Sequence, residues 1–324
     1  MTRRFQPLCS AKVFAKDKET TDKHIAMLRF PALVSIKWDG WRMFEYGGRA
    51  LCRSMDPPKN LHVQKTLGEM FRDIKERTGL VGLDGEAIGG SDRFARNGMQ
   101  LSTSAFGSVN KVMDFTFNAF DSSQYADRPF TERLDQVQNA VERVRGDWPF
   151  LYFTEHKEVT SLEETTEYLD YVLTELGAEG VMGRRPDGPY KLGRSTMKDG
   201  ILWALKPYDD GECEIVELHE MMENQNEATI NSRGHTQRSG HQANMVPKGT
   251  FGRAVCRDEK RWPGVTFNIG MGPGLNDELR KYIWEHKDEF IGATLKYKFQ
   301  AIGCVDRPRQ PKWMGIRPAE DMAK

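Results

Sequence analysis

A lysine stands among residues that suit nucleophilic chemistry in the string IKWDGWR, residues 36–42. A lysine amine attacks an electrophile only when it is unprotonated, so burial and neighbouring cations must lower its pKa from about 10.4. Ile36 and the following tryptophan cover Lys37, and Arg42 adds a positive field. The Asp-Gly turn would present the amine, although a solubilising lysine on a surface hairpin has the same local sequence. A nucleophilic lysine is therefore a hypothesis that needs partners elsewhere in the chain.

Strands and helices alternate through the first two-thirds of the chain and must position this lysine. Residues 33–46 and 49–53 are rich in aromatic and branched residues and flank Gly47-Gly48, which predicts a hairpin. Further strands are expected at 80–88, 115–120 and 180–182. Apolar residues at helical spacing predict helices at 61–79 and 130–145, and a Ser-x-x-Glu capping box at Ser161 opens a third that runs to 177.

The pattern changes near residues 206–211, where proline and glycine interrupt it. We expect two domains there, 1–208 and 209–324, within an α+β fold of antiparallel sheets and helices. The second domain has short strands and one helix at 277–289 with Asn276 as its N-cap, a content that predicts a β-barrel of the OB-fold type. Its strands are expected at 213–217, 251–256, 265–269 and 294–299. The polar residues 224–249 are expected to form a long mobile loop.

Charge is unevenly distributed, although the formal net charge of the 324 residues is zero. Basic residues dominate 230–262, including Arg233, Arg238 and Lys248, whereas acidic residues gather in 155–179. The basic segment is expected to face phosphates.

Composition and cysteine spacing exclude several classes of protein. With 38% hydrophobic and 29% charged residues the chain can bury a core, and no apolar run is long enough for a signal peptide or a membrane span. The five cysteines form no CxxC pair, and His235 and His241 lack further ligands nearby, so no zinc site is expected. We expect a cytoplasmic monomer with no membrane partner.

Ordered motifs strengthen the hypothesis for Lys37. KWDGWR, residues 37–42, fits KxDGxR and resembles the nucleophile motif of the superfamily that contains ATP-dependent DNA ligases, RNA ligases and mRNA-capping enzymes. Strings that resemble the other motifs follow in order: RS at 53–54, LDGE at 83–86, FNAFD at 117–121, EGVMGR at 179–184, YKLGRS at 190–195, LWALKP at 202–207 and RQPKWMGIRPAED at 309–321. The last string resembles the final motif of small viral and bacteriophage-type DNA ligases. The chain is therefore identified as a member of that group, with ATP and Mg²⁺ as cofactors and nicked double-stranded DNA as its partner.

The resemblance implies a role for each motif residue. Lys37 accepts AMP, and Lys206 contacts the α-phosphate. The residues expected to contact ATP are Ile36, Arg42, Arg53, Glu86, Phe120, Arg184, Lys198, Lys206 and Arg309. Glu179 and Glu86 are the expected metal ligands, Phe120 the expected stacking partner of adenine, and Arg309 the expected contact of the triphosphate. The residues expected to contact DNA are Arg53, Arg233, Arg238 and Lys248. Taken singly, such matches also fit a core phenylalanine or a buried ion-paired carboxylate.

Positions 184, 204 and 313 depart from the family pattern, and Trp313 of the last motif, where phenylalanine is common, is a conservative change. The fifth motif normally has two lysines, and Ala204 stands where the first is expected. Arg184 stands where a lysine is common, and Lys198 or Arg184 is a candidate to supply the missing phosphate contact.

Two alternatives stay open at this point. An RNA ligase or capping nucleotidyltransferase shares the lysine chemistry, although the final motif is less typical of capping enzymes. An inactive relative that only binds nucleic acid would explain Ala204, but the intact Lys37, Glu86, Glu179 and Lys206 argue against it. The sequence does not decide between replication and repair, or between nicks, cohesive ends and blunt ends.

Overall fold

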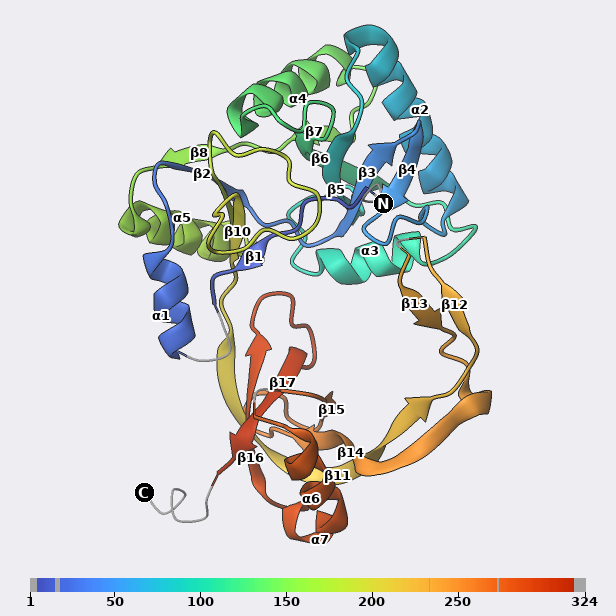
Figure 1. The fold of residues 1–324 in the computed structure, drawn as a ribbon, viewed down its shortest axis with the longest axis vertical. Helices are drawn as coiled ribbons and strands as arrows, with labels where there is room; N and C mark the ends of the chain where they lie inside the picture. Colours follow the sequence, from blue (N-terminus) through green and yellow to red (C-terminus); the bar gives the residue numbers. More distant parts are fainter. Residues whose placement is uncertain (1–4, 15–17, 233, 273, 318–324) are drawn as a thin grey trace. The chain divides into compact units, whose positions relative to one another are not determined.

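The structure, a computed structural model, describes residues 5–14, 18–232, 234–272 and 274–317. It divides into two compact units, one ending at Lys206 and one beginning at Pro207. Each unit combines helices with mostly antiparallel sheets (Figure 1), which confirms the predicted α+β class.

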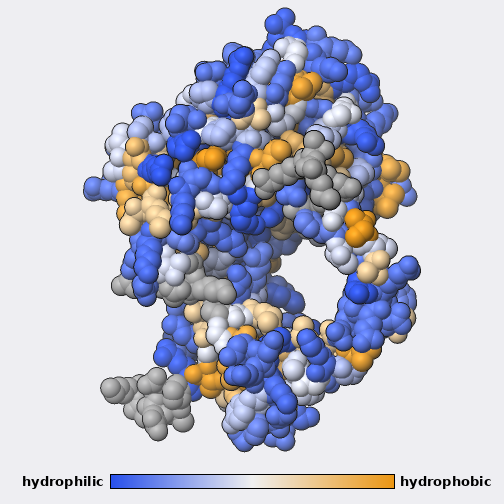
Figure 2. All heavy atoms as spheres, viewed as in Figure 1, coloured by the Kyte–Doolittle hydropathy of each residue, from blue (hydrophilic) through white to orange (hydrophobic). Residues whose placement is uncertain are grey.

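The first sheet of the N-terminal unit has the strand order β4-β3-β5-β6-β7. Its strands are β3 (Trp41–Tyr46), β4 (Arg49–Cys52), β5 (Leu83–Gly89), β6 (Phe115–Ser122) and β7 (Leu151–Phe153). Helices α2 (Leu61–Thr78) and α4 (Phe130–Val144) cover one face of this sheet (Figure 1). Their outward surfaces are mostly hydrophilic (Figure 2), as expected for amphipathic helices on a core.

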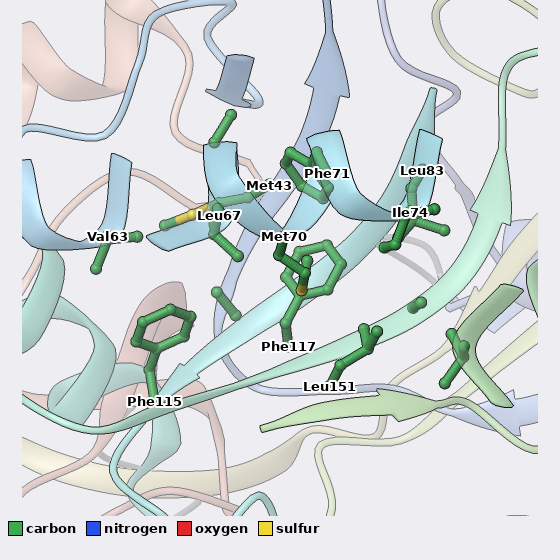
Figure 3. Close-up of a cluster of buried hydrophobic side chains, with 14 of the residues drawn as sticks. Met43, Val63, Leu67, Met70, Phe71, Ile74, Leu83, Phe115, Phe117 and Leu151 are labelled. Atoms are coloured by element: carbon green, nitrogen blue, oxygen red, sulfur yellow. The ribbon is translucent and has the colours of Figure 1, made fainter. Parts of the chain in front are cut away.

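Helix α2 shows how local sequence builds this core. The Asn60 side chain accepts a hydrogen bond from the Val63 amide at 2.9 Å, and Gly79 ends the helix with φ 76°, so the helix predicted at 61–79 is confirmed. The apolar side chains on its inner face meet the sheet (Figure 3): Val63, Leu67, Met70, Phe71 and Ile74 pack with Met43, Leu83, Phe115, Phe117 and Leu151.

Among the described residues, no helix has the length and apolarity to cross a membrane.

The second sheet of this unit has the order β1-β10-β9-β2-β8. Its strands are β1 (Ala11–Lys12), β2 (Ala32–Ile36), β8 (Lys157–Val159), β9 (Val181–Arg184) and β10 (Leu202–Leu205). One face packs in a core with Leu169 and Val172 of α5 (Leu162–Thr174). Ser161 caps α5 by accepting from the Glu164 amide at 3.2 Å, while the Glu164 carboxylate bonds the Thr160 amide instead of closing the predicted capping box. The unit also contains α1 (Lys18–Ala26) and α3 (Gly98–Phe106).

The strand predicted at 33–46 is wrong as one element. Residues 32–36 belong to the second sheet and residues 41–46 to the first, with the chain crossing between the sheets at 37–40. Glycine is required in this crossing because a Cβ at Gly40 would lie 2.3 Å from the Ala87 carbonyl oxygen. The predicted hairpin around Gly47-Gly48 is confirmed for β3 and β4, with both glycines at positive φ.

The C-terminal unit contains a sheet with the order β15-β14-β11-β16-β17. The strands are β11 (Asp209–Asn224), β14 (Met245–Arg257), β15 (Thr266–Ile269), β16 (Thr294–Gln300) and β17 (Arg309–Ile316). A bridge between Gly270 and Lys312 links the two edges, but no closed barrel is seen among the described residues. The helix predicted at 277–289 is two helices, α6 (Asp277–Glu285) and α7 (Lys287–Phe290), and Asn276 caps α6 by accepting from the Leu279 amide at 2.8 Å.

The long loop predicted at 224–249 is wrong. β11 ends at the first residue of this segment and β14 covers residues 245–249, and between them β12 (Ala228–Ile230) pairs with β13 (Thr236–Arg238) as an antiparallel hairpin, followed by the short 3-10 helix η1 (Gln242–Asn244). The Asn226 amide donates to the Ser239 and His241 carbonyls at 2.9 and 2.7 Å. All residues of the two short strands β12 and β13 are exposed, so they have no buried apolar face that a sequence pattern could indicate. We call residues 224–245 the β12–β13 ribbon.

Candidate active site

Three charged side chains meet at the end of the second sheet where β2 and β10 finish and β9 begins. Lys37 follows β2 and Lys206 follows β10, and both strands lie antiparallel to β9, which Glu179 precedes by two residues. One carboxylate oxygen of Glu179 pairs with the Lys37 ammonium and the other with the Lys206 ammonium. Glu179 is buried, with 5% of its side chain exposed, whereas Lys37 keeps 26% exposed. The candidate nucleophile is thus anchored and accessible.

Gly180 explains why these residues come together. The Lys37 amide donates to the Gly180 carbonyl at 2.8 Å, which extends the β2–β9 ladder to the lysine itself. A Cβ at Gly180 would lie 2.2 Å from the Leu205 carbonyl oxygen, and its φ of +151° is one that L side chains rarely adopt. The Glu-Gly step is therefore needed to bring β10 and Lys206 close to Glu179.

The first sheet contributes a second group of predicted residues. Arg42 on β3 lies directly opposite Glu86 on β5, and Phe120 on β6 is the half-buried position in a strand that is otherwise buried. Met43, which follows Arg42 on β3, and Phe117 on β6 pack in the core on the other face of the sheet. The Arg42 and Arg184 guanidinium carbons lie 5.6 and 5.7 Å from the Phe120 ring centroid. This half-exposed ring between two cations is suited to stack on a planar group.

Two residues that the sequence did not single out hold Arg42. The Asp84 carboxylate takes two hydrogen bonds from the Arg42 guanidinium, from Nε at 2.9 Å and from Nη2. The Tyr190 hydroxyl donates to Asp84 at 2.7 Å. Both residues lie inside motif strings quoted above, so their position in those strings was the available signal. Arg42 is a fixed cation as a result.

Glu86 has an unusual protonation equilibrium. Burial raises the pKa of Glu86 to about 7, although Lys37 and Arg42 act to lower it. On the strand opposite, Asn118 Oδ1 is buried and has no hydrogen-bond partner among the described residues. A divalent cation would stabilise the charged Glu86 carboxylate, and Mg²⁺ is commonly held by one or two carboxylates together with substrate phosphates. Glu86 and Glu179 therefore fit a Mg²⁺ ion that the substrate helps to hold.

Beyond Glu86 and Glu179, the described residues form no dedicated metal-binding cluster. In the part of the chain that the structure describes, no group of three or more His, Cys, Asp or Glu side chains could hold a metal ion.

Arg184 belongs to a buried ionic cluster. It donates to the Asp121 carboxylate at 2.5 Å, and Arg133 donates to the same carboxylate at 2.9 and 3.3 Å. Burial is the largest cause that lowers the pKa of Arg184 from its ordinary value, and the nearby Asp121 acts in the opposite direction. His156, which sequence reasoning missed, has a pKa lowered to about 3, chiefly by burial and then by Arg184, so its imidazole is neutral at physiological pH.

Replacing Asp121 by alanine should strongly destabilise the N-terminal unit. The Asp121 side chain is fully buried, so its loss leaves two buried guanidinium groups without their carboxylate. We expect the free energy of unfolding, measured by urea denaturation, to fall by about 3–5 kcal/mol. Asp147→Ala is the control, because this exposed partner of Arg77 should contribute less than about 1 kcal/mol. Equal losses in the two variants would contradict a structural role for the cluster.

The remaining predicted residues of the N-terminal unit take no part in the ion pairs of Glu179 described above. Ile36 ends β2 and is buried in the core, whereas Arg53 is exposed in the turn after β4. Lys198 is exposed in the loop before β10, at the opposite end of that strand from Lys206.

The predicted residues after 206 belong to the C-terminal unit. Arg309 begins β17, Arg238 ends β13, and Lys248 is exposed on β14. Arg233 lies outside the described residues.

Comparisons with known proteins identify the family. The domain model described as "ATP dependent DNA ligase domain" matches residues 12–199. A crystal structure of Chlorella virus DNA ligase-adenylate is similar, with 26% identity, 98% of this chain and 99% of that chain covered, and a TM-score of 0.51. A structure from a study of Lig E DNA ligases has the same fold, with 20% identity, 95% and 99% coverage and a TM-score of 0.62. No curated protein matches the chain. These matches confirm the resemblance predicted from the motifs.

Proposed function

The chain belongs to the family of ATP-dependent DNA ligases, enzymes that seal nicks in DNA, and on this premise we propose that Lys37 carries AMP between ATP and the 5′ end of the nick. The observation that supports this assignment most is the accessible Lys37 amine held on Glu179 beside Lys206. The family match also favours a DNA ligase over the alternatives of an RNA ligase or a capping nucleotidyltransferase.

The proposed reaction has three transfers. First, the Lys37 amine loses a proton and attacks the α-phosphorus of ATP; a nitrogen–phosphorus bond forms, and the bond to the β-phosphate oxygen breaks to release pyrophosphate. Next, a 5′-phosphate oxygen of the nick attacks the same phosphorus, and the Lys37 amine leaves. Finally, the 3′-OH attacks the activated 5′-phosphate, and AMP departs as the phosphodiester forms.

Each contributing side chain has a physical role in this scheme. Lys206 lies beside the α-phosphate oxygens and stabilises their negative charge. Arg42, which Asp84 holds in place, is a second cation near the nucleotide. Phe120 stacks on the adenine. Glu86 and Glu179 would hold Mg²⁺, which when bound neutralises charge on the phosphate oxygens during transfer. Arg53, with its bidentate fork, is assigned to the 5′-phosphate of the nick.

The C-terminal unit is proposed to be the OB-fold domain of the ligase. Its five-stranded sheet, its helix α6 and the bridge between its two edges support this assignment. The β12–β13 ribbon and the start of β14 present exposed Arg238 and Lys248. We assign these side chains to the phosphate backbone of DNA, where contact is independent of sequence.

Incubation with a nicked duplex tests the proposed function. With ATP and Mg²⁺ the protein should seal a nick bearing a 3′-OH and a 5′-phosphate, and a covalent AMP adduct should appear before DNA is added. Labelled GTP should not attach. A protein that binds the duplex but forms neither adduct nor sealed product would contradict the proposal and identify an inactive relative.

Neutralising two cations of the C-terminal unit should change the salt dependence of DNA binding. The double variant Arg238→Ala/Lys248→Ala should lower the slope of log affinity against log salt by about 2, because each phosphate contact contributes about 0.9. Formation of the AMP adduct should stay unchanged. Lys281→Ala/Lys287→Ala, which removes two exposed cations from α6 and α7, is the matched control. If both double variants keep the wild-type slope, Arg238 and Lys248 do not contact the DNA backbone.

A further inference from the structure

The second sheet presents an additional cation beside Lys206. Gly180 immediately precedes β9, and extending the register of β2, β9 and β10 by one residue places it between Lys37 and Lys206 in one row across the sheet. Two residues further along the strands, the next row on the same face is given by the register of four neighbouring strands, and its members are Ser35 on β2, Met182 on β9, Ala204 on β10 and Lys12 on β1. Lys12 is thus the direct neighbour of Ala204.

Burial shows which face of the sheet Lys12 occupies. Ala11 and Val13, on either side of Lys12, are buried in the same core as Trp203 and Leu205, whereas Lys12 is exposed. Because side chains alternate along a strand, Lys12 lies on the opposite face from that core. Ala204 and Lys206 lie on that face too, by the same alternation along β10.

The spacing allows Lys12 and Lys206 to act on one polyphosphate. Strands lie about 4.8 Å apart and rise about 3.3 Å per residue, which puts the two Cα atoms roughly 8 Å apart. Ala204 is buried and its side chain ends at Cβ, so no long side chain of position 204 stands between Lys12 and Lys206. No hydrogen bond or ion pair holds the Lys12 ammonium to another described residue.

The charge of the site favours an additional cation near the phosphates of ATP. Lys37 and Lys206 share the single carboxylate of Glu179, whereas the triphosphate of ATP is a polyanion. The two other cations considered for this role are placed less well. Arg184 is engaged by Asp121, and Lys198 precedes the far end of β10.

We propose that Lys12 binds the β- and γ-phosphates of ATP and supplies, from the neighbouring strand, the positive charge that position 204 lacks. This inference rests on the proposed function of Lys37. Lys12 orients the leaving pyrophosphate, so it acts in the transfer of AMP to the enzyme. A nick that already carries 5′-AMP has no pyrophosphate for Lys12 to bind.

Rescue from the neighbouring strand tests the proposal. Lys12→Ala should raise the ATP concentration needed for half-maximal adduct formation roughly tenfold, as expected for loss of one charge-assisted contact. Single-turnover closure of a pre-adenylylated nick should stay within about twofold of wild type. Adding Ala204→Lys to Lys12→Ala should restore most of the ATP affinity, because both side chains reach the same space. Lys23→Ala, an exposed lysine of α1, is the matched control and should behave as wild type.

The outcomes distinguish this proposal from the function on which it rests. Unchanged ATP dependence in Lys12→Ala, with a normal adduct on Lys37 in the wild type, would overturn the role of Lys12 alone. Equal losses in both half-reactions without rescue by Ala204→Lys would also overturn it and make Lys12 a structural or DNA-binding residue. A wild-type protein that forms no adduct at all would overturn the proposed function itself.

Discussion

Replacing Lys37 by alanine is expected to abolish the covalent AMP adduct. The structure places Lys37 and Lys206 on the same carboxylate, but Lys206 is the less exposed of the two, with 16% of its side chain accessible against 26%. Lys206 also follows β10, outside the turn that presents Lys37. We therefore expect the adduct to fall below about a thousandth of the wild-type level, as when a covalent nucleophile is removed. Intact-mass measurement after exposure to ATP and Mg²⁺ reports the result.

A second substitution separates loss of the nucleophile from loss of charge. Lys37→Arg keeps a cation that can pair with Glu179, but a guanidinium stays protonated and does not attack phosphorus. It should therefore also lack the adduct while it keeps a melting temperature near that of the wild type. Lys59→Ala, an exposed lysine in a loop, should form the adduct normally. An adduct that survives in Lys37→Ala would move the nucleophile to another residue.

Replacing Arg309 by alanine is expected to separate the two half-reactions. Arg309 begins β17 in the C-terminal unit, and the family resemblance assigns its motif to the triphosphate. ATP has a pyrophosphate that must be oriented in line with its departure, whereas a pre-adenylylated nick has none. We expect the single-turnover rate of adduct formation to fall by about 100-fold or more, with closure of pre-adenylylated DNA largely retained.

The design of this experiment depends on the packing of β17. Deleting residues 306–324 would remove Trp313, which is buried against Phe251 with ring centroids 5.4 Å apart, so the deletion can unfold the sheet. The point variant avoids this loss. Arg307→Ala is its control, because Arg307 is exposed and pairs with Asp306 nearby. Equal losses in both half-reactions would make Arg309 a structural or DNA-binding residue.

The candidate site and the fold differ in how far the sequence predicts them. The helices at 61–79 and 130–145 follow from apolar periodicity, and the first also from its caps, which are local properties. The pairing of β12 with β13 was not predicted. Both strands are exposed on both faces, so they have no buried apolar face that the sequence pattern could indicate. The break at 37–40 was missed because strand-forming residues flank it on both sides, at 32–36 and 41–46, and no local pattern shows that the two strands enter different sheets.

The sequence by itself determined the family and the candidates Lys37, Glu179 and Lys206, because each motif is a short string whose residue types reflect one step of the chemistry. Only the tertiary structure decided that both ammonium groups share one carboxylate and that Arg42 is held by Asp84. It also brought Lys12 beside Ala204, although 191 residues separate them in the chain (204 − 12 − 1). These pairings depend on the register between strands distant in sequence, and register is set by how the two faces of each sheet pack, a property that no local string contains.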